Sequence, residues 1–216
     1  GLILRKASLH DDLSGRWLAL FVTLACLYVV PWMCGYSGWY SRDGYREFLF
    51  FIPFQQLFFL GPALYFYVKS LLNKQFQFRR HHWWHFVPGM LYLAYSLVVF
   101  VYDQFLVDEY YFYADGRDKD MASWYQCIGF LSMLIYAVLS FRYYNGYRKL
   151  IFQELSYADS VAFGWVRKFL IALLTILLLR FVFFLLYPGF GSFGPKWWYY
   201  LLFSGLVYFI SLVGYS

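Results

Sequence analysis

The stretch from Arg46 to His85 limits the possible folds of this chain more than any other. Residues 48–72 are apolar or aromatic throughout, apart from Gln55, Gln56, Lys69 and Ser70. A helix needs roughly 20 such residues to cross a hydrocarbon core about 30 Å thick. The sequence therefore predicts a membrane-spanning helix over 48–72, with kinks at Pro53 and Pro62 of the kind that membrane helices tolerate.

A cationic and aromatic border follows this apolar run. It contains Lys74, Arg79, Arg80, His81, His82, Trp83 and Trp84. Such a border is typical of the place where a helix leaves the membrane on its cytoplasmic side. We therefore expect the end of the 48–72 helix to face the cytoplasm, and this end orients the other predicted spans.

Composition excludes a large soluble core. The chain is 62% hydrophobic and 27% aromatic but only 14% charged, whereas soluble domains carry about 25% charged residues. We expect one polytopic membrane domain over residues 1–216. The net charge of +6 would also suit nucleic acid, but the basic residues flank apolar stretches, which favours lipid headgroups as their counter-charge.

Five more apolar stretches complete a predicted all-α transmembrane bundle of six spans. They cover residues 17–34, 86–102, 123–143, 165–187 and 197–213. Most of the 18 Lys and Arg residues fall in the segments 1–16, 73–84 and 144–164 or at their edges. This asymmetry predicts that these segments and the C-terminus face the cytoplasm. The opening GLILRK looks like the end of a further apolar segment, so we expect a seventh span in the intact protein.

A resemblance to a known family rests on three segments. They read RWLALFVTLACLYVVPWMCGYSGWY, FFIPFQQLFFLGPALYFYVKSLLN and GWVRKFL. These segments resemble the membrane-embedded N-terminal domain of bacterial AraC-type transcriptional regulators, over most of residues 14–216. Related seven-helix sensor domains also precede histidine kinases and other output domains, so the type of output stays open.

The resemblance implies a function and partners. It implies a signal-input domain that relays an outer-side signal to a cytoplasmic helix-turn-helix domain beyond residue 216. DNA would be contacted only through that further domain. The resemblance also implies a homodimer, because helix-turn-helix regulators commonly read paired half-sites.

Arg180 is the most informative polar residue. It lies in TILLLRFVFFLLYP, about eight residues before Pro188, which places it roughly 12 Å deep. A charge at that depth costs at least about 2.5 kcal/mol on insertion scales, so it should face protein or a water-filled cavity. Ligand-binding residues for a small anionic ligand are predicted at that level: Arg180, Gln55, Gln56 and Ser204, with Ser96 within reach.

The alternative for Arg180 is a structural role, in which Gln side chains and carbonyl groups hold its charge inside the bundle. Two other functions also stay open at this stage. One is a structural subunit of a larger membrane complex, and the other is a transporter or channel subunit, which would need a polar path to the cytoplasm. No Ser/His/Asp or Cys/His arrangement for catalysis is apparent, so we expect neither an enzyme nor a cofactor.

Three further patterns have simpler explanations than a bound ligand. His81, His82 and His85 include an i, i+4 pair but no neighbouring carboxylate or thiol, which favours interfacial anchors over a metal site. The GFGSFG of residues 189–194 matches a dinucleotide motif outside a βαβ unit and predicts a turn. The acidic loop of residues 103–122 predicts solvated charge. The three cysteines, of which Cys34 and Cys127 could pair, favour free thiols: Cys26, Cys34 and Cys127.

Overall fold

The computed structural model describes residues 13–107, 119–154, 164–186 and 197–215. Within these ranges every regular element is helical, so the predicted all-α class is confirmed. The helices are α2 (Leu13–Tyr36), α3 (Asp43–Phe51), α4 (Leu57–Leu72), α5 (Val87–Tyr102), α6 (Ser123–Glu154), α8 (Gly164–Leu186) and α9 (Trp197–Tyr215). Short helical turns join them: η1 (Trp39–Ser41), η2 (Arg80–Phe86), η3 (Asp103–Val107) and η5 (Lys119–Met121).

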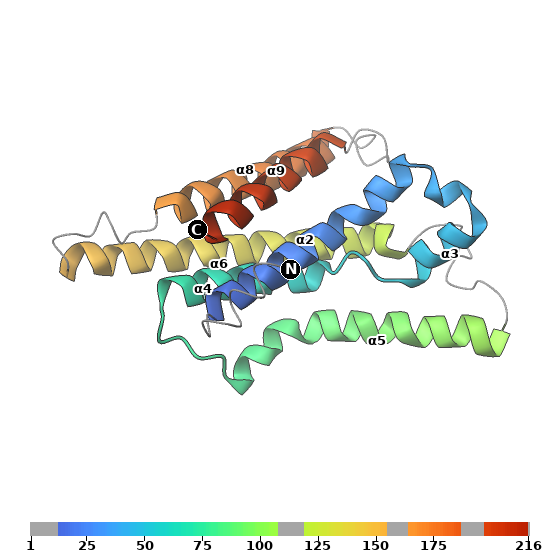
Figure 1. Cartoon of the computed structure of the whole chain (residues 1–216), viewed down its shortest axis with the longest axis horizontal. Helices are drawn as coiled ribbons and strands as arrows, with labels where there is room; N and C mark the ends of the chain where they lie inside the picture. The colour runs from blue at the N-terminus through green and yellow to red at the C-terminus, as the bar shows by residue number, and fades with distance from the viewer. Residues whose placement is uncertain (1–12, 108–118, 155–163, 187–196, 216) are drawn as a thin grey trace.

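The helices form an elongated bundle whose members run roughly along its long axis (Figure 1). Helix α4 packs against α2 and α6, and helices α8 and α9 pack against each other and against α6 and α2 respectively. Helix α5 contacts the bundle through α4. The core between these helices is rich in aromatic rings: Phe21, Tyr28, Trp32, Tyr67, Tyr125, Tyr144, Phe169, Tyr199, Tyr200 and Phe203.

In the part of the chain that the structure describes, four helices are long and apolar enough to cross a membrane, as judged by length and composition. They cover Leu13–Tyr36, Arg80–Tyr102, Ser123–Gln153 and Trp197–Gly214. The chain is thus compatible with a multi-pass membrane protein, but the expected count of six spans is not supported. Helix α4 has only 16 residues, and α8 carries three cations, Arg167, Lys168 and Arg180, within its 23 residues.

The predicted single helix over 48–72 is wrong in its first half. Helix α3 ends at Phe51, the backbone is extended at Ile52 (φ −86°, ψ 117°), and α4 begins at Leu57. Pro53 explains the break, because proline lacks an N–H group and disfavours the helical conformation of the residue before it. Pro62, in contrast, lies inside α4 without ending it.

Helix α6 is longer than predicted. The expected span 123–143 continues without interruption to Glu154, so the first half of the polar segment 144–164 is helical. The N-cap proposed for the next helix, at Asp159 or Ser160, lies outside the described residues, as does the glycine-rich turn at 189–194.

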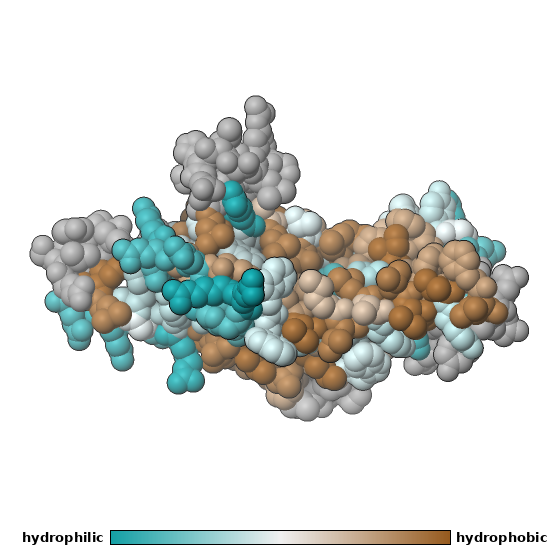
Figure 2. Space-filling model, turned by 90° about the horizontal axis from the view of Figure 1, so that it is seen from below, coloured by the Kyte–Doolittle hydropathy of each residue, from teal (hydrophilic) through white to brown (hydrophobic). Residues whose placement is uncertain are grey.

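One end of the molecule is basic. The starts of α2, α5 and α8 and the ends of α4 and α6 meet there (Figure 1). The exposed cations in these segments are Arg16, Lys74, Arg79, Arg80, Lys149, Arg167 and Lys168. Figure 2 shows hydrophilic side chains concentrated toward one end of the molecule and apolar side chains over most of the rest of that face.

Candidate functional site

Arg180 continues the buried stripe of α8. Leu173 and Leu177 lie seven and three residues before it and are almost fully buried, and this spacing puts all three side chains on one face of a helix. The guanidinium therefore points into the bundle rather than toward its surroundings. Its Nη1 donates a hydrogen bond to the Tyr28 hydroxyl at 2.6 Å, and its Nη2 donates to the Gln126 Oε1 at 3.2 Å.

Two aromatic rings complete the surroundings of Arg180. Its guanidinium carbon lies 4.5 Å from the centre of the Tyr199 ring and 5.5 Å from that of Phe130, distances at which cation–π attraction operates. The Tyr28 hydroxyl in turn donates to the Tyr199 hydroxyl at 3.4 Å. Among the described residues, no carboxylate is a partner of Arg180. Its charge is held by hydrogen-bond acceptors and ring faces from α2, α6 and α9.

Gln126 links Arg180 to the break before α4. Its amide nitrogen donates to the side-chain oxygen of Gln55 and to the backbone oxygen of Asp120 at 2.6 Å. The Gln55 amide nitrogen donates to the backbone oxygen of Tyr28 at 3.2 Å. Gln55 is fully buried, so these bonds satisfy a side chain that would otherwise be costly to bury.

Two side chains satisfy the backbone of the break. The Asp120 Oδ2 accepts a hydrogen bond from the Gln55 N–H at 2.9 Å, and its Oδ1 accepts from the Tyr92 hydroxyl at 2.6 Å. The Tyr125 hydroxyl donates to the Gln55 carbonyl and accepts from the Leu57 N–H at 3.3 Å. Buried backbone groups that leave a helix need such partners in place of water. The break is thus a built feature of the fold.

The Asp120 carboxyl is perturbed by its burial. Only 3% of the residue is exposed, and loss of solvent raises its pKa to about 6, with the hydrogen bonds from Gln55, Tyr92 and Phe54 opposing the rise. This group therefore titrates closer to neutral pH than an ordinary aspartate. The sequence-based expectation that the acidic loop is solvated is wrong at both described ends, because Asp103 and Asp120 are buried.

Eight side chains form one connected set, the Arg180 network: Tyr28, Gln55, Tyr92, Asp120, Tyr125, Gln126, Arg180 and Tyr199. It includes two of the four residues predicted for the site, Arg180 and Gln55, and they are joined through Gln126 rather than directly.

The other two predicted residues lie elsewhere. Gln56 follows Gln55 but donates to the backbone oxygen of Pro53, because successive residues of an extended segment point in opposite directions. Ser204 donates to the Tyr200 carbonyl one turn earlier in α9, at 2.7 Å. Ser96 does the same toward Tyr92 in α5. Neither serine is bonded to Arg180.

Sequence reasoning missed three of the partners, Tyr28, Gln126 and Asp120. Gln126 offered a signal, because it is an amide near the start of an apolar stretch and has the same side chain as Gln55. Tyr28 gave none, since it is one of 23 tyrosines in the chain. Asp120 was hidden among the other acids of its stretch of sequence, and only the contact of η5 with the break distinguishes it.

The histidines of η2 have packing roles. The Nδ1 of His82 accepts a hydrogen bond from the Arg79 N–H at 3.0 Å, and the Nδ1 of His85 lies 2.8 Å from the Tyr136 hydroxyl. Rings surround the buried His82 at centroid distances of 5.2 to 5.3 Å, namely Phe66, Phe76 and Phe78. Among the described residues, no group of three or more His, Cys, Asp and Glu side chains could hold a metal ion. The described cysteines are free thiols.

Comparisons with family models, with curated proteins and with solved structures give no match for this chain.

Proposed function

We propose that this chain is the membrane-embedded signal-input domain of an AraC-like transcriptional regulator in the bacterial inner membrane. The Arg180 network is the observation that carries the proposal. It joins α2, α5, α6, α8 and α9 and the broken segment before α4 into one hydrogen-bonded unit. An intramembrane cation whose described partners are all neutral is a candidate receptor for an anionic ligand.

The signal would act by competition for the donors of Arg180. A ligand shifts a conformational equilibrium only through contacts that differ between the two states. A small anion from the outer side would take N–H groups that Arg180 now donates to Tyr28 and Gln126. Helices α2 and α6 would then lose their polar links to α8. Helix α9, whose Tyr199 packs on the guanidinium, would shift with Arg180.

The orientation in this proposal follows from the basic end. Exposed cations gather where α2, α5 and α8 begin, and cytoplasmic loops of membrane proteins carry an excess of Lys and Arg. Helix α9 ends at the same end (Figure 1). Movement of α9 would therefore reach a cytoplasmic DNA-binding domain, which we propose to act as a homodimer.

Substitution of Arg180 in the full-length protein, in its native host, tests this function. Arg180→Met should reduce the transcriptional response by at least about tenfold per membrane-inserted protein, because a tenfold change needs only about 1.4 kcal/mol of lost coupling. Arg180→Lys should retain part of the response, since a point charge cannot replace the planar fork. Arg142→Met, an exposed cation on α6, is the matched control and should leave the response unchanged.

Two results would contradict this function. A normal response from stably inserted Arg180→Met protein would remove the ligand role. If the response falls only in proportion to the thermal stability in detergent, Arg180 has a structural role. That role is expected for a structural subunit of a larger membrane complex.

A transporter or channel subunit is the second candidate, and the break at 52–56 favours it. Transporters commonly bind substrates where a spanning helix is interrupted and its backbone lines a cavity. Here the freed backbone groups are bonded to Asp120 and Tyr125. Flux of ions or organic anions into vesicles that contain the purified protein, abolished by Asp120→Asn, would favour transport over signal input.

A further inference from the structure

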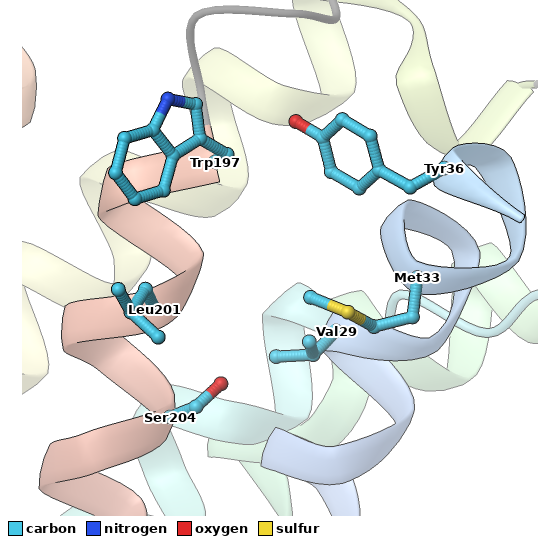
Figure 3. Close-up of a pocket in the computed structure, with 6 residues that line it drawn as sticks. All are labelled: Val29, Met33, Tyr36, Trp197, Leu201 and Ser204. Atoms are coloured by element: carbon cyan, nitrogen blue, oxygen red, sulfur yellow. The ribbon is translucent and has the colours of Figure 1, made fainter.

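An open groove lies between α2 and α9, apart from the Arg180 network. Its volume is about 650 Å³, and the residues that line it are Val29, Met33, Tyr36, Trp197, Leu201 and Ser204 (Figure 3). The two helices run antiparallel, so that Tyr36 faces Trp197 at one end and Val29 faces Ser204 at the other. The lining residues extend over seven residue steps on each helix, from 29 to 36 and from 197 to 204, which gives the groove a length of roughly 10 Å.

The wall of the groove is apolar and exposed. Met33 is 47% exposed and Leu201 61% exposed. The Ser204 hydroxyl donates a hydrogen bond to the Tyr200 carbonyl of its own helix, so its O–H group is already bonded within α9. On the inner side, α2 and α9 touch through stacked rings, with the centroids of Trp32 and Tyr200 4.6 Å apart. The groove is therefore closed toward the bundle core and open outward.

Polar atoms mark the mouth of the groove. Figure 3 shows the Tyr36 hydroxyl and the Trp197 indole nitrogen at the end where α2 finishes and α9 begins. Trp and Tyr at such helix ends lie at the headgroup level of a bilayer. Because α2 and α9 are both candidate membrane spans, the groove runs from the headgroup level into the hydrocarbon region.

We infer that this groove binds one acyl chain of a membrane phospholipid, with the ester region of the lipid at Tyr36 and Trp197. A flexible chain can follow the uneven wall formed by Met33 and Leu201. A helix from a second copy fits the wall less well, because close helix contacts in membranes use small residues and this wall is formed mainly by large ones. The inference is independent of the signal-input function.

Photochemical labelling tests the groove. The full-length protein is placed in vesicles of phosphatidylethanolamine and phosphatidylglycerol that contain a phosphatidylcholine with a diazirine in its acyl chain. After irradiation, mass spectrometry should locate adducts within 29–36 and 197–204. Leu201→Trp, which fills the groove, should lower this labelling roughly tenfold, equivalent to about 1.4 kcal/mol of binding.

Leu202→Trp is the matched control, since Leu202 is 47% exposed beside the groove residue but does not line it. It should leave labelling unchanged. Equal labelling of groove residues and of the exposed Leu212 in the wild-type protein would overturn the inference, because it would show only general lipid contact. So would cross-linking of two copies through these residues without lipid adducts. The wild-type adduct map decides the question even if Leu201→Trp fails to fold.

Discussion

At the scale of single residues, Asp120 shows how burial can link stability to pH. Its pKa in the folded protein is about 6, above the ordinary 3.8. The folded state therefore binds more protons than the unfolded state between these values, and the free energy of unfolding falls as the pH rises through this window. Above about pH 6 the buried carboxylate is charged and lowers the free energy of unfolding by its full desolvation cost. Protonation removes this cost as the pH falls.

Asp120→Asn should remove this pH dependence. Wild-type protein should gain on the order of 1 kcal/mol of stability between pH 7 and pH 5 relative to the variant. The measurement is chemical unfolding in detergent at both pH values, with the variant subtracted from the wild type. The histidines are present in both proteins, so the difference isolates Asp120. An identical pH dependence of the two proteins would show that Asp120 stays ionised.

The substitution Tyr125→Phe, which removes a single oxygen atom, tests how the break is stabilised. Its hydroxyl serves both the Gln55 carbonyl and the Leu57 N–H, so Tyr125→Phe leaves two buried backbone groups without this partner. The Leu57 N–H also donates to the Gln55 carbonyl at 2.9 Å, and this bond remains in the variant. We therefore expect a loss of about 0.5–1.5 kcal/mol in the free energy of unfolding, together with faster hydrogen exchange at Leu57. Tyr208→Phe, at a residue that is 68% exposed, should change neither quantity. Unchanged exchange at Leu57 in Tyr125→Phe would contradict this account.

At the scale of elements, glycine permits the close packing of α4 on α6. A Cβ added at Gly129 would collide with Leu57 Cδ1 and lie 2.6 Å from Leu57 Cβ, and one added at Gly61 would lie 2.7 Å from Tyr136 Cδ2. The Cβ of Leu57 is held by the start of α4 and cannot move freely. Helix α4 therefore lies against α6 at a distance that only small residues allow.

Gly129→Ala should destabilise the protein by about 1–3 kcal/mol through overpacking. Gly146→Ala is the matched substitution in the same helix, where an added Cβ meets nothing within 4 Å. It should stabilise the protein by up to about 1 kcal/mol, because alanine is the better helix former. Thermal unfolding in detergent measures both. A stabilising Gly129→Ala would show that the two helices can separate without cost.

At the scale of the whole molecule, the basic end predicts the orientation in the membrane. The test uses single cysteines in a protein that lacks Cys26, Cys34 and Cys127. An impermeant maleimide added to intact cells should label Ser37→Cys and should reach Gln75→Cys only after the membrane is opened. Both positions are exposed in the structure, so burial does not affect the comparison. The reverse pattern would place the basic end outside.

The sequence by itself determined the class of the protein and the position of most helices. An apolar run long enough to cross a bilayer is a local property, so the segments 17–34, 86–102 and 197–213 correspond closely to helices in the structure. The polar surroundings of Arg180 followed from the cost of a charge within an apolar helix. From Pro53 the sequence predicted a kink but not an interruption of the helix. Whether a proline interrupts a helix depends on the hydrogen-bond partners that the tertiary structure offers to the freed backbone groups.

Only the tertiary structure decided which residues meet. Tyr28 lies 152 positions from Arg180 in the sequence, and their contact depends on the rotation and relative height of α2 and α8, which no local pattern sets. The same holds for Gln55 and Gln56, which are chemically identical yet differ in partners. Asp120 became a buried partner of the break, rather than a solvated charge, because the position of η5 removes it from water and supplies donors from Gln55 and Tyr92.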